Sequence, residues 1–169
     1  MKHTISVLVE NHPGVLSKVS GLFSRRAFNI DSLAVGITED PAVSRITIVV
    51  NGDDSITEQV EKQLNKLIDV IKVKTLKPGE YISRELMLIK VHANATTRSE
   101  IVQIADIFGA RIVDVSRTTL TMECSDVSAR LRNFEEMLEP YGIREIARTG
   151  MIALEKGVSL TRAKAGVEE

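Results

Sequence analysis

The residues best placed to do chemistry lie in one short stretch, Glu10 to Leu16, where an alternating apolar pattern gives way to a helical one. Pro13 suits the first turn of a helix because its missing N–H would have no partner there, and Gly14 lets the backbone approach a bound group closely. The unpaired amides of a first helical turn, together with the positive end of the helix dipole, bind anions. This stretch therefore predicts a site for a carboxylate.

A strand-to-helix turn with Pro and Gly also occurs for geometry alone, so the turn needs supporting features before it indicates a ligand site. Two amide side chains are such features, because they add hydrogen-bonding groups close to the turn. Asn11 lies within the stretch, and Asn29 lies just before the second expected strand. Together they favour a binding site over a purely structural turn.

The remaining candidate groups do not form a recognisable catalytic or metal site. His3, His12 and His92 lie far apart, and none has metal-ligand spacing with Cys124, which we interpret as a core residue of an alternating strand. The sequence has no glycine-rich dinucleotide fingerprint, no phosphate-binding loop and no nucleophile elbow. We therefore expect no catalytic residues, no metal and no cofactor in this chain, and an enzyme that works by itself is disfavoured.

The composition of the 169 residues is that of an ordinary globular protein, with 43% apolar and 27% charged residues. Lys and Arg number 22 against 23 Asp and Glu, so the net charge of -1 provides no general attraction to nucleic acid or to an anionic membrane. We expect no cleavable leader and no membrane span, because no apolar run is long enough to cross a bilayer. A cytoplasmic protein that binds neither nucleic acid nor membrane is the expectation.

Hydrophobic periodicity predicts the same order of elements in both halves of the chain. In the first half, strands are expected over residues 4–9, 30–37, 45–50 and 70–75, and helices over 15–26 and 56–67. In the second half, strands are expected over 86–91, 111–115, 119–124 and 143–151, and helices over 98–108 and 127–138. Ser55 and Glu58 have the spacing of a capping box at the start of the second helix. Leu33, Val35 and Ile37 share one face of the second strand.

Each half is predicted to be a ferredoxin-like β-α-β-β-α-β unit, in which both helices cover one face of a four-stranded antiparallel sheet. The fold class is therefore α+β, with two such domains in tandem. We place the first domain at residues 1–76, a linker at 77–80, the second domain at 81–157 and a flexible C-terminal tail at 158–169. Domains of about 75 residues are only marginally stable alone, so packing of the two halves or dimerisation is expected.

The run from Asn11 to Leu16, followed by the run from Asn29 to Leu33, resembles the ACT domain of the regulatory small subunits of acetolactate synthase, also called acetohydroxyacid synthase. The resemblance covers nearly the whole chain, including the Pro78-Gly79 linker and the second ferredoxin-like domain. It implies that the ACT domains of two chains pair side by side into one eight-stranded sheet. It also implies that amino-acid sites lie at this homodimer interface.

The resemblance further implies a site built from both chains, with the first loop of one chain facing the second strand of the other. The expected ligand is valine or another branched-chain amino acid, which would mediate feedback inhibition of the catalytic large subunit that this chain activates. Thiamine diphosphate, magnesium and FAD are expected on that large subunit. The expected binding residues are Asn11, His12, Pro13, Gly14, Val15, Leu16, Asn29, Ile30 and Val35.

A free-standing ACT sensor, acting on a different amino-acid enzyme or on transcription, shares the same fold and the same loop. The sequence leaves this alternative open. Binding to an acetolactate synthase large subunit separates the two interpretations.

Overall fold

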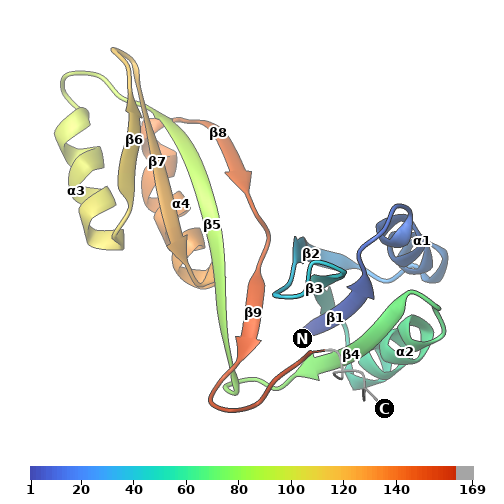
Figure 1. Ribbon diagram of the computed structural model, residues 1–169. Helices are drawn as coiled ribbons and strands as arrows, with labels where there is room; N and C mark the ends of the chain where they lie inside the picture. The colour runs from blue at the N-terminus through green and yellow to red at the C-terminus, as the bar shows by residue number, and fades with distance from the viewer. Residues whose placement is uncertain (163–169) are drawn as a thin grey trace. The chain divides into compact units, whose positions relative to one another are not determined.

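The structure is a computed structural model that describes residues 1–162, and it divides the chain into two compact units. Within the described residues, the first unit contains Met1–Ile82 together with residues 151–162, and the second contains Ser83–Gly150. Each unit has the β-α-β-β-α-β order and an antiparallel sheet, so the predicted α+β fold of two ferredoxin-like units is confirmed. Figure 1 shows the two units along the chain.

The sheet of the first unit has the strand order β2-β3-β1-β4, with all its pairs antiparallel. Both helices pack on one face of this sheet (Figure 1), which leaves the opposite face free of helices. The elements of this unit are β1 (Lys2–Glu10), α1 (Val15–Arg26), β2 (Ile30–Ile37), β3 (Val43–Asn51), α2 (Asp54–Asn65) and β4 (Val70–Leu76).

The core of the first unit follows from the period of two in its central strands. Alternate residues of β1 and β3 point towards the helices, and the register places Val7 opposite Ile46 and Ile5 opposite Ile48. The helices contribute side chains spaced three or four residues apart, as an amphipathic helix requires. The buried members of this core are Ile5, Val7, Val9, Val15, Val19, Leu22, Phe23, Ile46, Ile48, Val50, Val60 and Leu64.

The helix-free face of the first sheet is covered in part by the C-terminal segment, residues 151–162. The backbone N–H of Met151 donates to Ser32 Oγ at 3.0 Å, and Lys74 Nζ lies 2.5 Å from Glu155 Oε1. Thr161 is only 7% exposed, and its carbonyl accepts from Arg45 at 2.8 Å. Apolar and hydroxyl side chains of the central strands are consequently buried on this face.

The C-terminal segment differs from the sequence prediction in two respects. The strand expected over 143–151 ends at Arg148, as β8 (Ile143–Arg148), and a further strand that was not predicted follows it, β9 (Ile152–Glu155). By contacts, residues 151–162 belong to the first unit, whereas the sequence placed residues 81–157 in the second domain. Of the expected tail, 158–169, residues 163–169 lie outside the described part of the chain, and Thr161 is packed on the first sheet.

The second unit has the sheet order β6-β7-β5-β8, and β9 also pairs with β5. Cys124 is buried in its core, as predicted, and burial raises the pKa of this thiol. The elements of this unit are β5 (Tyr81–His92), α3 (Arg98–Phe108), β6 (Arg111–Val115), β7 (Thr119–Asp126), α4 (Ser128–Leu138), the 3-10 helix η1 (Glu139–Tyr141) and β8.

The start of α2 corrects the predicted capping box. Asp53, and not Ser55, is the N-cap residue, and its carboxylate accepts from the N–H of Ile56 at 3.1 Å and from Ser55 Oγ at 2.6 Å. Asp is as good an N-cap as Ser. The helix therefore starts two residues earlier than the sequence pattern indicated.

Candidate functional site

The turn between β1 and α1 has the backbone geometry of an open anion site. Gly14 is the N-cap of α1 in a left-handed conformation, with φ 88° and ψ -11°. No side chain caps this helix start, and its first turn contains no acidic residue. The amide of Lys18 makes the first helical bond, to the carbonyl of Gly14 at 3.1 Å. The amides that precede Lys18 therefore belong to an uncapped first turn, at the positive end of the helix dipole.

Asn11 is anchored so that its side chain offers an acceptor. Its backbone N–H donates to the carbonyl of Ala42 at 2.8 Å, and its side-chain Nδ2 donates to the carbonyl of Pro41 at 2.9 Å. The residue is exposed. Because the amide nitrogen is engaged with Pro41, the oxygen Oδ1 is the atom left to accept a hydrogen bond from a ligand.

The other predicted site residues lie on and beside β2. Asn29 is exposed at the entrance to this strand, and its carbonyl accepts from the N–H of Asn51 at 3.3 Å. Ile30 packs partly against the core, whereas Val35 of β2 and Leu16 of α1 remain 48% and 44% exposed. In the described part of the chain, the loop of Asn11 makes its hydrogen bonds to the β2–β3 turn and to the α2–β4 loop, and none to Asn29.

Strand β2 is an edge strand with an exposed apolar row. Among the described residues it pairs only with β3, so its outer backbone groups have no strand partner. Leu33 lies opposite Ile48 and Val35 lies opposite Ile46, which places both on the face that carries the helices. Leu33 is nevertheless 37% exposed and Ile37 is 66% exposed. An unpaired edge with exposed apolar residues is a template for pairing with another chain.

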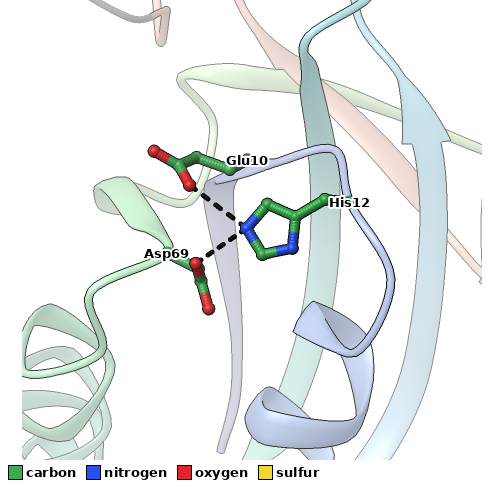
Figure 2. Close-up of side chains that lie close together, drawn as sticks. All are labelled: Glu10, His12 and Asp69. Carbon is green, nitrogen blue, oxygen red and sulfur yellow. Dashed lines mark hydrogen bonds and ion pairs between the residues drawn. The ribbon is translucent and has the colours of Figure 1, made fainter.

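His12 belongs to a cluster of charges that sequence analysis missed, shown in Figure 2. Its Nε2 lies 2.8 Å from Asp69 Oδ1 and 3.2 Å from Glu10 Oε2, and its Nδ1 lies 3.2 Å from the carbonyl of Pro13. Lys18 of α1 donates to the second oxygen of Asp69 at 2.7 Å. Asp69, which is 7% exposed, thus joins the loop and α1 to the start of β4.

The cluster favours the charged forms of His12 and Asp69. The carbonyl of Pro13, which accepts from Nδ1, is the main group that raises the pKa of His12 above its usual value of 6.5, and Asp69 and Glu10 raise it further. The ammonium of Lys18 is the main group that lowers the pKa of Asp69, and His12 adds to this effect. With His12 protonated, two cations face two carboxylates, and both ring nitrogens donate.

Glu10, His12 and Asp69 also offer three ligand atoms within 4.8 Å of one another, which is the spacing of a metal site. Lys18 already compensates Asp69, however, and the second oxygen of that carboxylate is engaged. We assign the cluster to positioning: it holds the turn that ends in Gly14. No sequence signal pointed to it, because Asp69 lies 57 residues from His12.

None of the helices in residues 1–162 combines the length and the apolar character that a membrane span requires.

Comparisons with known proteins match both halves of the chain. A family model described as the AHAS small subunit-like ACT domain matches residues 5–72, and one described as the small subunit of acetolactate synthase matches residues 84–157. The chain is 54% identical to the acetolactate synthase small subunit of Mycolicibacterium smegmatis, over 92% of this chain and 91% of the relative. It is also 54% identical to the probable acetolactate synthase small subunit of Archaeoglobus fulgidus, over 93% and 98%.

A solved structure agrees with these matches. The crystal structure of the acetolactate synthase small subunit from Thermotoga maritima superposes with a TM-score of 0.88 at 42% identity, and the match covers 93% of this chain and 98% of that chain. The matches extend over the loop of Gly14, the edge strand β2 and the second unit alike. The chain therefore belongs to the family of acetolactate synthase small subunits, the regulatory chains of that enzyme.

Proposed function

We propose that this chain binds a branched-chain amino acid, most strongly valine, between two copies of its ACT domain, and so mediates feedback inhibition of acetolactate synthase. Membership of the small-subunit family implies a partnership with the catalytic subunit. Thiamine diphosphate, magnesium and FAD belong, in this proposal, to that partner. The observation that carries the proposal is the uncapped, glycine-started turn at Gly14, beside the free acceptor of Asn11.

The two ends of an amino acid fit the two kinds of group at this turn. The carboxylate takes the amides of the first turn of α1, where the helix dipole also favours negative charge. The ammonium donates to the amide oxygen of Asn11 or to that of Asn29 from the second chain. His12 and Pro13 support the site indirectly, because the ion pair with Asp69 holds the backbone between them and Gly14.

The exposed row on β2 supports a site made by two chains. Antiparallel pairing of two β2 edges satisfies their outer backbone groups and covers Leu33 and Val35. In that arrangement, the apolar wall of the site comes from Leu16 of one chain and from Ile30 and Val35 of the other. Each site is then incomplete without the second copy.

The size of the ligand side chain sets the affinity range. Burial of a valine side chain contributes about 1.5–3 kcal/mol, and a carboxylate at a partly buried helix start contributes up to about 2 kcal/mol. These magnitudes suit reversible sensing of a metabolite. One methylene changes affinity by about 10- to 200-fold, so valine, leucine and isoleucine bind with graded strength.

Control of the partner enzyme requires that the ligand favour one arrangement of the complex over another, since equal affinity for both states shifts nothing. A ligand that bridges two ACT domains changes how the pair is held. A coupling free energy of about 1–3 kcal/mol between this site and the catalytic subunit is typical of such systems.

The test combines calorimetry on this chain with the activity of the reconstituted enzyme. L-valine is titrated into the wild-type protein, the Gly14→Asp variant and the Asn29→Ala variant. We expect Gly14→Asp to weaken binding because it adds negative charge at the helix start and strains a residue with positive φ. Valine affinity that is unchanged in Gly14→Asp would refute the placement of the site.

Mixed dimers test whether two chains build each site. A dimer with Gly14→Asp in one chain and Asn29→Ala in the other should keep one intact site, because both changes fall in the same two-chain site. If the two changes instead damage both sites, each site is contained in a single chain.

Reconstitution tests the partnership itself. The chain should co-purify with an acetolactate synthase large subunit, raise its activity and make that activity sensitive to valine. Valine binding without association with the large subunit would instead support a free-standing ACT sensor that acts on another enzyme or on transcription.

A further inference from the structure

A second candidate binding region lies on the helix-free face of the first sheet, where the C-terminal segment crosses it. A cavity of about 450 Å³ lies there, lined by Glu39 of the β2–β3 turn, by Arg45 of β3, by Leu76 of β4 and by most of residues 153–162. This volume is in the range of small-ligand sites. All of its lining residues belong to the first unit. The cavity is thus separate from the helix-bearing face, on which α1 and Gly14 lie.

Four charged residues line this cavity: Glu39 and Arg162 are exposed, whereas Glu155 and Arg45 are half-buried. Arg45 is thus the half-buried cation of the lining, and it lies on β3. One of its terminal nitrogens donates to Ser6 Oγ and the other to the carbonyl of Thr161, both at 2.8 Å. Both acceptors are neutral, and within residues 1–162 no carboxylate forms an ion pair with this guanidinium. A guanidinium carries five N–H donors, so donors remain for an anion.

Two further polar atoms of the cavity lining have unmet hydrogen-bond capacity. Glu155 Oε2 and Thr161 Oγ1 are buried without a partner, although the other oxygen of Glu155 pairs with Lys74. Buried polar groups are nearly always hydrogen-bonded, so such atoms require a partner. An ionised carboxylate oxygen accepts only, and it therefore requires an N–H or O–H donor.

Part of the remaining lining is apolar and buried. Leu76 and Ala153 are each 4% exposed and line the cavity beside Arg45. A matching ligand therefore combines an anionic group for the guanidinium, a hydrogen-bond donor for Glu155 and a short aliphatic part. We propose that this cavity binds a small aliphatic carboxylate with a hydroxyl or amino group on the carbon next to the carboxylate.

This site does not depend on the amino-acid site at Gly14, so the two proposals can fail separately. The carboxylate of the ligand pairs with Arg45 and accepts from Thr161 Oγ1, while its hydroxyl or amino group donates to Glu155 Oε2. Occupancy ties the C-terminal segment to the sheet through a charged bridge, in addition to the neutral contact between Arg45 and the Thr161 carbonyl.

The test follows backbone amide signals by NMR while the labelled full-length chain is titrated with 2-hydroxy-3-methylbutanoate, L-valine or 3-methylbutanoate. We expect the hydroxy acid or the amino acid to shift the amides of Ala153, Glu155 and Thr161. If the hydroxy acid causes the shifts, the donor group is a hydroxyl, and if L-valine causes them, it is an amino group. The third compound lacks that donor and should bind more weakly. Shifts at Gly14 report the other site.

Variants of Arg45 decide whether the shifts arise from the proposed contact. Arg45→Gln should raise the Kd at the cavity about 10- to 100-fold, the loss expected for a charge-assisted hydrogen bond, and Arg45→Lys should lose less. Arg144→Gln, at an exposed residue of β8, is the matched control and should not change the Kd. Absence of shifts at the cavity residues at millimolar ligand, or an unchanged Kd in Arg45→Gln, would overturn the proposal.

Because Arg45→Gln also removes contacts to Ser6 and Thr161, its folding is checked from the dispersion of its amide spectrum. If Arg45→Gln does not fold, the test uses Arg45→Lys, since this variant keeps the positive charge but loses the planar, bidentate geometry of the guanidinium. A Kd for Arg45→Lys equal to that of the wild type would then count against the site.

Discussion

The left-handed conformation of Gly14 predicts how much backbone strain a substitution at this position introduces. A Cβ built on Gly14 meets no atom within 4 Å, so replacement by Ala creates no clash and changes only the cost of φ 88°. An L-residue in this conformation destabilises the folded state by about 1–2 kcal/mol. The lower conformational entropy of the unfolded chain with Ala offsets about 0.4–1 kcal/mol of this loss. Gly14→Ala should therefore lower the free energy of unfolding by about 1 kcal/mol.

Gly21 provides a matched control in the same helix. It lies inside α1, and a Cβ there also meets no atom within 4 Å, but its φ is not positive. Ala in place of Gly within a helix stabilises by about 0.5–1 kcal/mol. The same chemical change, made seven positions apart, should thus move stability in opposite directions, with a difference of about 1.5–2 kcal/mol between the variants.

Urea denaturation measures this difference, with both variants at one protein concentration because association shifts apparent stability. Calorimetry with L-valine then shows whether the backbone conformation also matters for binding. Gly14→Ala should weaken valine binding because it disturbs the amides of the first turn, whereas Gly21→Ala should not. Equal stabilisation by the two substitutions would show that the turn does not require the left-handed conformation.

Three further predictions concern the charge cluster, the edge strand and the core. NMR titration should place the pKa of His12 above 6.5. Because this pKa is raised in the folded state, the contribution of His12 to the stability of the fold is present below pH 6.5 and is lost as the pH rises through the folded pKa. An ordinary pKa for His12 would contradict the cluster. Val35→Lys should shift the chain towards monomers in sedimentation velocity, because it puts a charge on the exposed β2 edge. The control Val113→Lys, at a similarly exposed residue on the edge of the second sheet, should not. A dimer that persists unchanged in Val35→Lys would exclude pairing through β2. Leu64→Ala should lower the free energy of unfolding, measured by urea denaturation, by about 2–5 kcal/mol. Ile68→Ala, at a side chain that is 94% exposed, should lower it by less than about 0.5 kcal/mol. Similar losses in the two variants would contradict the assigned core.

Most of the secondary structure could be predicted because its signals are local. The period of two in β1 and β3 and the spacing of three or four in α1 are properties of short windows, and they indicated which residues face the helices. Helix ends were less predictable. Asp53 and Ser55 are both good N-caps, and only the backbone geometry shows that Asp53 is the one used.

The candidate site was predictable in part for the same reason. Pro13 and Gly14 mark a helix start on their own, and the left-handed φ of Gly14 agrees with that interpretation. The role of His12 was not predictable, because Asp69 lies in a different loop and reaches it only after β1 and β4 have paired. Likewise, the apolar row on β2 follows from alternation, but its exposure follows from the strand's position at the sheet edge.

The two ferredoxin-like units, the helix start at Gly14 and the resemblance to a known family were predictable from the sequence, because each depends on residues close together in the chain. The ion-pair cluster at Asp69 and the packing of residues 151–162 on the first sheet emerged only from the three-dimensional structure. The contact of Arg45 with Thr161 spans 116 residues. No local pattern encodes such a contact, since it depends on which sheet face the helices leave open.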